Sequence, residues 1–528
     1  MIPTLFRPKT SAALMALLLA STTPALAQTT PSVARTGVQD HAASYAAASS
    51  RFSSLMVFDT TGPGPAAPGS AAPEPGHPAS TSPSVSDSGR PEDGALSLPY
   101  DLAALITLME NGNPSIAISQ SAEEAAKGDL SGAKARRYPT LRQEASGAYL
   151  GNPQDAIEIP ANAFAPIFPS DPIPLMPAVD PIQYSFKLIG ELPLFTWGKT
   201  GAGIKASESA LGAARLQLAK TMHEKRMQLQ ASWEALACVA AAEEALALQA
   251  KAGQRLAILA EQNQHSGFIT TVELLDVRLK VKQTAIAQSR LAENRERLLA
   301  DLASLAGLDG LSLDQLYLEL PAAVPVPGSE ADSQVTIPAG NYDLALARVQ
   351  VDSRRSLEAL ASTQAKGLPD LGLRAELSYG GSRLPYTTND WEDKTDWQLI
   401  LSIGASGTLF GDPVKAGAAV RAKAELDQAR AQLTEGQNQL RAYIRESYLN
   451  LDLLRSRLEY SLLQQEYWAA SLVQEQTRLD LGAGSETEYL SLLMEALGGL
   501  AEGYGILAEY RAVILGLQGA AGATSGMD

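Results

Sequence analysis

Short segments in which every second residue is apolar predict the strands of this chain, because a period of two is typical of a β-strand with one buried face. The alternation is strict over 182–188 and 371–379, continues at 397–403, and is weaker over 140–150. We expect four strands, each with about the 9 to 11 residues that a tilted membrane-spanning strand needs. Half-buried strands of a soluble sandwich alternate in the same way, so the pattern alone favours neither environment.

Much longer segments have the apolar spacing of helices. Residues 199–264 contain no proline and carry apolar residues at roughly heptad spacing, which predicts a helix of ~100 Å with a narrow apolar stripe. A break near Gly267 leads into a second helix over about 271–305. The same pair of helices returns over 411–480 and up to about residue 517. Each pair reads as a helical hairpin whose stripe packs against neighbouring helices.

The second half of the chain repeats the first. Gly267 recurs as Gly482 and Glu273 as Glu488, in both cases 215 positions later (482 minus 267, and 488 minus 273). This offset of 215 holds from about residue 195 to 307 without a gap. Upstream the offset is 230, so the first copy carries 15 extra residues between Leu141 and Leu194 (230 minus 215). The fold is therefore one unit used twice, a strand pair that feeds a long helical hairpin, and not a short-period solenoid.

The N-terminus is laid out as a secretory signal peptide. Arg7 and Lys9 precede an apolar stretch over 12–20, and Ala-Leu-Ala at 25–27 forms a cleavage site. The apolar stretch is too short to cross a bilayer as a helix, so we expect export rather than an anchor. Residues 28–95 are rich in Ala, Ser, Pro and Gly, which predicts a disordered tail.

A second cluster of helix breakers, from Pro321 to Gly340, separates the two copies. We therefore expect the chain to divide into a signal peptide, a disordered tail, a first repeat, a linker, a second repeat and a C-terminal tail, over residues 1–27, 28–95, 96–310, 311–340, 341–520 and 521–528.

Composition excludes several classes of function. The net charge is −16, or −18 once Arg7 and Lys9 leave with the signal peptide (40 minus 58), which argues against a nucleic-acid partner. The only cysteine, Cys238, permits neither an internal disulfide nor a cysteine metal site, and it lies too far from the cleavage site for lipidation. The four histidines have no metal spacing, and the chain has no nucleophile elbow or phosphate-binding loop. We expect no enzyme, no metal and no cofactor.

Several motifs resemble, in their order, those of the TolC family of outer-membrane efflux and secretion channels. They are an opening helix that ends in Asn-Pro, a helix that enters a strand through Pro-x-Leu, a Pro-Leu-Phe-Thr-Trp-Gly junction, and two glycine turns before Leu-rich helices: 105–114, 133–141, 193–198, Gly267 and Gly482. The resemblance covers about 96–520, that is, both copies.

The resemblance implies a mainly α fold with a small β part, assembled as a homotrimer. Three chains would form a 12-strand β-barrel that an α-helical barrel continues. Association also follows from the pattern itself, because the mature chain lacks an apolar run of 18 residues and four strands cannot close a barrel alone. The implied function is a passive exit duct of a tripartite efflux or type I secretion system, in the outer membrane of a Gram-negative cell. Its partners would be outer-membrane lipid, a periplasmic adaptor and an inner-membrane pump.

The resemblance and the alternation together assign three sets of candidate residues. The lipid-facing strand residues are Tyr184, Phe186, Leu188, Leu373, Tyr379, Trp397 and Leu399. The adaptor-docking tips are Gly267, Phe268, Ile269, Leu481, Gly482 and Ala483. The pore or gate residues are Glu488 and its counterpart Glu273. A ring of three Glu488 carboxylates would attract cations, but an acid at this position is equally typical of a solvated helix N-terminus.

The chain departs from the family at the gate. Ser491 stands where a further acid is expected, and Leu479 and Gly484 stand where some members have the Tyr and Arg that tie the gate shut. We therefore expect another latch, with Asp480 and Arg478 as candidates.

The alternative to a channel is a periplasmic coiled-coil adaptor or scaffold without a pore. Adaptors flank a single hairpin with compact Gly-rich β-domains, so two hairpins that each follow a strand pair favour the channel. A wide hydrated tunnel needs no specific pocket, and the sequence accordingly carries no signature of the exported substrate or of the class of pump.

Overall fold

The computed structural model describes residues 45–52, 99–161, 172–176, 181–320, 328–381, 397–406 and 413–522. The expected signal peptide and most of the expected tail lie outside these residues. The described chain forms two compact units, a sheet unit of residues 120–217 and 343–436, and a hairpin unit that contains the remaining residues.

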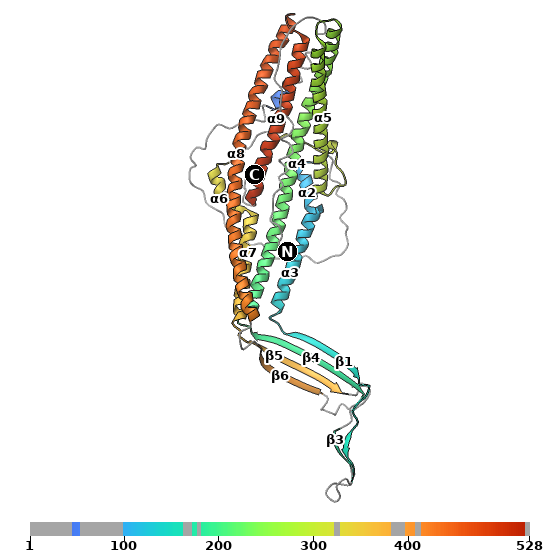
Figure 1. Cartoon of the computed structure of the whole chain (residues 1–528), viewed down its shortest axis with the longest axis vertical. Helices are drawn as coiled ribbons and strands as arrows, with labels where there is room; N and C mark the ends of the chain where they lie inside the picture. The colour runs from blue at the N-terminus through green and yellow to red at the C-terminus, as the bar shows by residue number, and fades with distance from the viewer. Residues whose placement is uncertain are drawn as a thin grey trace, which may run out of the picture. The chain divides into compact units, whose positions relative to one another are not determined.

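The sheet unit contains one four-stranded antiparallel sheet with the order β1-β4-β5-β6 (Figure 1). Its strands are β1 Thr140–Tyr149, β4 Ile182–Phe195, β5 Asp370–Gly381 and β6 Trp397–Ser406. These are the four strands that the alternation predicts. Each repeat contributes one pair of strands, β1 with β4 or β5 with β6. The pairing of β4 with β5 joins the two repeats into one sheet.

A second, two-stranded ribbon lies in the connection between β1 and β4. It consists of β2 Ile157–Ile159 and β3 Ile173–Met176, which pair antiparallel with an irregularity next to Ile157. The connection belongs to the first repeat. Between its short helices and its long helix, the first repeat has 15 residues more than the second (230 minus 215). The ribbon lies within this longer connection.

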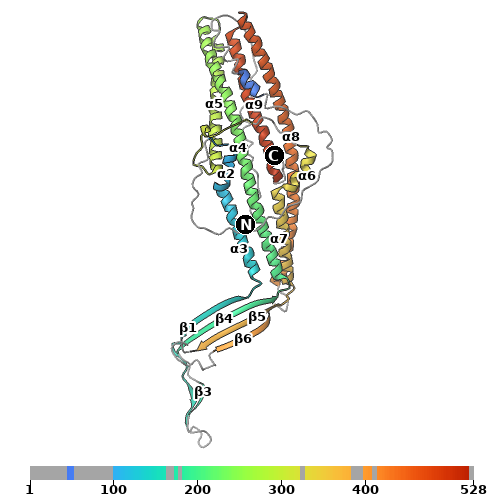
Figure 2. The ribbon, with the colours of Figure 1, turned by 180° about the vertical axis from the view of Figure 1, so that it is seen from behind.

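The described helices are α2 Leu102–Gly112, α3 Pro114–Ala135, α4 Lys199–His265, α5 Thr271–Ala306, α6 Glu330–Gly340, α7 Tyr342–Ala365, α8 Pro413–Asp480 and α9 Glu486–Ala521. The four long ones, α4, α5, α8 and α9, have nearly the bounds that the sequence predicts. Helices α4 and α8, the two longest, have 67 and 68 residues. In the hairpin unit, α4 turns into α5 and α8 turns into α9 at the same end (Figure 2).

Helix α9 is the most buried element of the hairpin unit. It is the one described helix whose length and hydropathy would suffice to cross a membrane, but 56% of its apolar window is buried inside the protein. Leu490, Leu500 and Leu507 are fully buried and belong to the two apolar clusters that run along α9. Burial in the bundle therefore accounts for its apolar composition.

The heptad stripe of α4 is also buried as expected. Leu229 and Leu236 are fully buried, and Met222 packs at the edge of the same cluster, which also includes residues of α2 and α5. A stripe of this kind holds helices together by interdigitating side chains.

The duplication extends to individual hydrogen bonds. The Asn113 side chain donates to the Leu305 carbonyl at 3.0 Å, and the Asn341 side chain donates to the Ala520 carbonyl at 2.8 Å. Leu305 and Ala520 are 215 positions apart (520 minus 305). In both repeats an asparagine after a short helix thus satisfies an orphan carbonyl in the last turn of a long helix.

Two segments differ from the sequence prediction. The expected linker over 311–340 contains helix α6, which begins at the N-cap Ser329 and buries Ile337 against α9. Helix α6 precedes Asn341 as α2 precedes Asn113, so it opens the second repeat; Pro338 inside it hid the helical pattern. The expected disordered tail contains a helix over 45–52 with Tyr45 and Phe52 buried.

Candidate functional site

The strand register gives the four-stranded sheet two chemically different faces. Residues that pair across antiparallel strands point to the same side of the sheet. Phe186 pairs with Tyr379 and Tyr379 with Trp397, and Leu188 is in register with Leu399 through a residue of β5. All seven residues expected to face lipid lie on this one face: Tyr184, Phe186, Leu188, Leu373, Tyr379, Trp397 and Leu399.

Most of the apolar face is accessible. Leu399 is 65% exposed, Leu401 68% and Ile403 75%, all on strand β6. Tyr379 is the exception among the expected lipid-facing residues, because it is buried and its ring lies 4.9 Å from that of Trp397. An exposed apolar patch of this kind is rare on soluble monomers and marks a contact with lipid or protein.

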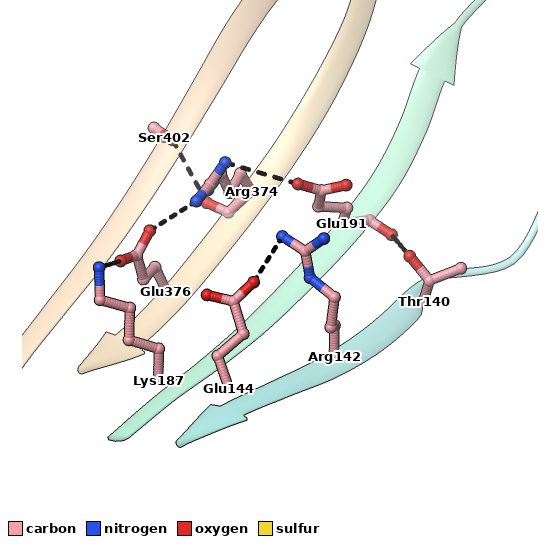
Figure 3. Close-up of polar contacts among 8 residues, drawn as sticks. All are labelled: Thr140, Arg142, Glu144, Lys187, Glu191, Arg374, Glu376 and Ser402. Carbon is pink, nitrogen blue, oxygen red and sulfur yellow. Dashed lines mark hydrogen bonds and ion pairs between the residues drawn. The ribbon is translucent and has the colours of Figure 1, made fainter. Parts of the chain in front are cut away.

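The opposite face carries a ladder of charges (Figure 3). Arg374 lies at its centre and contacts Glu376 at 2.8 Å and Glu191 at 3.5 Å. Lys187 lies 3.9 Å from the same Glu376. On β1, Arg142 contacts Glu144 at 3.1 Å.

Hydroxyl groups complete this face. Thr140 donates to the Glu191 carbonyl at 3.4 Å, and Ser402 donates to the Arg374 carbonyl at 3.5 Å. Three cationic and three acidic side chains form the ladder, so its formal charge is balanced: Arg142, Lys187, Arg374, Glu144, Glu191 and Glu376. Charged side chains lose free energy when they leave water, so this face favours an aqueous environment, whereas the opposite face favours an apolar one.

Strands β1 and β6 are the edges of the sheet. The strand order places each at one end, so among the described strands each has one edge without a pairing partner. Unpaired backbone groups at an exposed edge are a template for pairing with another chain.

The junction between β4 and α4 is tied to the start of β5. Trp197 has a left-handed backbone with φ of 53°, which is uncommon for a residue with a side chain. Its indole donates to the Pro369 carbonyl at 2.8 Å, and Lys199 contacts Asp370 at 2.9 Å. These contacts connect the Pro-Leu-Phe-Thr-Trp-Gly motif of the first repeat to the first strand of the second.

The two hairpin tips have the same backbone structure. Gly267 and Gly482 adopt φ of 77° and 72°, and the next amide donates back five residues, Phe268 to Asn263 and Ala483 to Arg478, both at 2.8 Å. This is the hydrogen-bond pattern of a Schellman cap, which favours glycine at the left-handed position.

The expected docking tips are accessible. Phe268 is 63% exposed and Leu481 is 78% exposed, and Ala483 is exposed as well, while Ile269 is half-buried.

The two candidate gate acids have different environments. The Glu273 carboxylate accepts from the backbone N–H of Thr270 at 2.7 Å, and the Thr270 hydroxyl accepts from the Glu273 amide at 3.2 Å. These two hydrogen bonds form a capping box, so the Glu273 carboxylate is engaged at the N-terminus of its own helix. Glu488 is exposed, and among the described residues it has no hydrogen bond or ion pair.

Gly484 and Arg478, next to the second tip, have defined local contacts. A Cβ on Gly484 would lie 2.9 Å from the Leu479 backbone nitrogen, so this position excludes any side chain. Arg478 pairs with Glu475 at 3.0 Å within α8.

An ion pair that the sequence does not predict joins the two repeats near the second tip. Arg255 of α4 contacts both carboxylate oxygens of Glu486 on α9, at 2.9 and 3.3 Å. Glu486 begins α9, directly after the second tip, so the pair fastens one hairpin to the other close to the turn. No local pattern connects two residues 231 positions apart, and only the tertiary structure brings them together.

Cys238 is buried as expected for a small apolar side chain, and burial raises the pKa of its thiol to about 12. Within the described part of the chain, no cluster of three His, Cys, Asp or Glu side chains could hold a metal ion.

A match to a known family covers the first repeat. Residues 105–308 match the model of the outer membrane efflux protein family. No curated protein matches the chain.

Solved structures extend the comparison to both repeats. The CmeC outer membrane channel of Campylobacter jejuni is similar with a TM-score of 0.63 and 17% identity, over 80% of this chain and 85% of CmeC. The outer membrane protein VceC of Vibrio cholerae is similar with a TM-score of 0.62 and 18% identity, over 80% and 96%. The MtrE outer membrane channel of Neisseria gonorrhoeae, in its open state, gives 0.56 and 13%, over 78% and 88%. Residues 105–308 thus match the outer membrane efflux protein family, and the chain has the fold of these TolC-like outer-membrane channels.

Proposed function

We propose that this chain is one protomer of a homotrimeric channel in the outer membrane of a Gram-negative cell. The observation that supports it best is the amphipathic sheet, in which one face is apolar and exposed and the other carries the charge ladder. Strands β1 and β6 each offer an unpaired edge, so β6 of one protomer would pair with β1 of the next. Three sheets of four strands would close a 12-strand barrel, within the range of outer-membrane barrels.

In this assembly the apolar face contacts lipid and the charge ladder lines a water-filled bore. The balanced charge of the ladder suits a passive duct that carries varied solutes, because it avoids a strong field of one sign. The helices of three hairpin units would continue the bore as an α-helical barrel into the periplasm.

The hairpin tips would form the periplasmic entrance of the duct. Exposed Phe268 and Leu481 would contact the hairpins of a periplasmic adaptor, and an inner-membrane pump would supply the energy. Glu488, exposed and without a partner among the described residues, would form the acidic ring at the entrance. The Arg255–Glu486 pair would be the latch that replaces the one used in other members of the family.

Export by the signal peptide at 1–27 and the absence of a lipid anchor are part of the proposal. The only cysteine is buried in α4, where it cannot carry an N-terminal lipid. The matched family consists of channels, which favours a function in tripartite efflux or type I secretion without any catalytic step.

The test is the behaviour of the detergent-purified protein. We expect a trimer by light scattering and stepwise conductance in a planar lipid bilayer. A monomer that does not raise bilayer conductance would contradict the proposal.

A periplasmic scaffold without a pore is the alternative. Carbonate extraction of membranes separates the two functions, because a scaffold would be released while a closed barrel would stay in the membrane fraction. Release of the intact protein would favour the scaffold.

A further inference from the structure

A helix over residues 45–52 lies against the hairpin unit, far along the sequence from the next described residue of the chain, Pro99. It is the short blue helix beside α9 in Figures 1 and 2. Tyr45, Ser49 and Phe52 are buried, whereas Ser50 and the other intervening residues are mostly exposed. Positions i, i+4 and i+7 share one face of a helix, so the segment buries a single face, as a helical peptide does in a binding groove.

The groove is shaped around Phe52. The Phe52 ring lies edge-on to Tyr504 of α9, with 5.1 Å between ring centroids. A Cβ on Gly503 would lie 2.6 Å from the Phe52 ring and 2.8 Å from the Ser461 hydroxyl. A side chain at position 503 would therefore displace the Phe52 ring.

Polar contacts fasten the segment to both repeats. The Tyr45 hydroxyl donates to the Gln465 side-chain carbonyl on α8 at 2.8 Å, and Arg51 lies 3.5 Å from Glu244 on α4. Burial raises the pKa of Tyr45 to about 12, so its hydroxyl remains a donor. The segment therefore spans from the first repeat to the second.

The groove also contains polar atoms that the segment does not satisfy. Among the described residues, the Gln465 amide nitrogen and the Ser461 and Tyr489 hydroxyls are buried without a hydrogen-bond partner. Unpartnered buried polar atoms weaken the docked state. An isolated helix of this length is also unstable in water, so the segment folds only when it binds.

We propose that α4, α8 and α9 form a binding groove for a short amphipathic helix, and that this chain's own residues 45–52 are its reversible occupant. The bound segment acts as a strap that holds the α8–α9 hairpin to α4. The inference stands on contacts inside one protomer and does not require the proposed channel function.

The groove can be tested with a fluorescent synthetic peptide of residues 41–56 and the full chain in detergent. Phe52→Ala in the chain should vacate the groove, so the peptide should bind this variant at least about tenfold more tightly than it binds the unaltered chain. A peptide with Phe52→Ala should bind at least about tenfold more weakly. No peptide binding, or equal binding to both chains, would overturn the proposal.

Two glycines of the same helix provide the matched control on the groove side. Gly503→Ala, added to the Phe52→Ala chain, should reduce peptide affinity at least about fivefold. Gly505→Ala should leave it unchanged, because a Cβ at Gly505 meets no atom within 4 Å. Equal peptide affinities for the two variants would contradict the packing of Phe52 against Gly503.

Hydrogen exchange on the unaltered chain needs no substitution and therefore does not depend on the folding of a variant. Reversible docking predicts that the amides of residues 45–52 exchange at least about a hundredfold faster than those of 500–507 in α9. Equal protection of the two segments would show that residues 45–52 are a permanent part of the core.

Discussion

Arg511 and Glu234 form a buried two-point ion pair between α9 and α4, with both N–O distances at 2.7 Å. The two side chains are 10% and 11% exposed. Arg511 is the one cationic residue of α9, so the pair fixes the position of α9 along α4 and thereby relates the second repeat to the first.

Removal of one partner should destabilise the protein strongly. We expect Arg511→Met to lower the free energy of unfolding by about 3–5 kcal/mol, because it leaves an uncompensated buried carboxylate. The double variant Arg511→Met with Glu234→Leu should recover most of the loss. Denaturant unfolding followed by circular dichroism measures both.

The more exposed pair Arg457–Glu509, at 3.1 Å between α8 and α9, is the control. Arg457→Met should change the free energy of unfolding by about 1 kcal/mol or less. Similar losses for Arg457→Met and Arg511→Met would contradict the role given to the buried pair.

The Cys238 thiol should resist alkylation in the folded protein. With its pKa raised to about 12 by burial, the thiolate fraction at pH 8 is roughly one in ten thousand, against about one in four for a free cysteine. We expect slow labelling by iodoacetamide at pH 8 in detergent and fast labelling in guanidinium. Mass spectrometry follows a single site, because the chain has one cysteine.

The same thiol makes stability depend on pH in the alkaline range. A pKa raised by folding contributes stability that is present below the unfolded pKa of about 8.5 and is lost as the pH rises through about 12. Cys238→Ala should reduce this loss. Labelling of the native protein as fast as of the unfolded protein would contradict the burial of Cys238.

Leu399 and Gln398 are neighbours on β6 that face opposite sides of the sheet. If the apolar face contacts lipid, Leu399→Arg should cost about 2–4 kcal/mol near the middle of the bilayer and lower the amount of trimer in the outer membrane. Gln398→Arg adds the same charge to the bore face and should assemble normally. Gel analysis of unheated membranes measures the trimer, and equal defects would argue against a lipid-facing surface.

Glu488 should influence ion selectivity and Glu273 should not. Glu488→Gln should weaken the preference for cations in planar bilayers, because it removes the charge of an acidic ring. Glu273→Gln weakens a capping box and should lower stability by about 0.3–1 kcal/mol without changing selectivity. An unchanged reversal potential in the Glu488→Gln variant would contradict a role for Glu488 at the gate.

Arg255→Gln should loosen the contact between the two hairpins at the tips. If the Arg255–Glu486 pair is a latch, this variant should raise single-channel conductance in planar bilayers. Arg278→Gln breaks a pair of 2.8 Å within the first hairpin and is the control. A higher conductance in both variants, or in neither, would show that the inter-repeat contact does not restrain the entrance.

Local patterns in the sequence determined the elements and their duplication. Alternation marked the four strands because one face of the sheet is mostly apolar, and glycine marked both tips because the cap needs a residue with a left-handed backbone. Helix α6 was missed because Pro338 interrupts the pattern, and residues 45–52 were missed because a short Ala- and Ser-rich helix is not stable without its groove.

The tertiary structure alone decided which distant residues meet. Arg255 and Glu486, and Arg511 and Glu234, are 231 and 277 positions apart, and nothing in the local spacing of either residue records its partner. The same holds for Phe52 and Gly503, whose fit depends on the packing of α8 and α9. A local period reports which side of an element is buried, whereas the contacts of charged and aromatic side chains depend on how the elements pack.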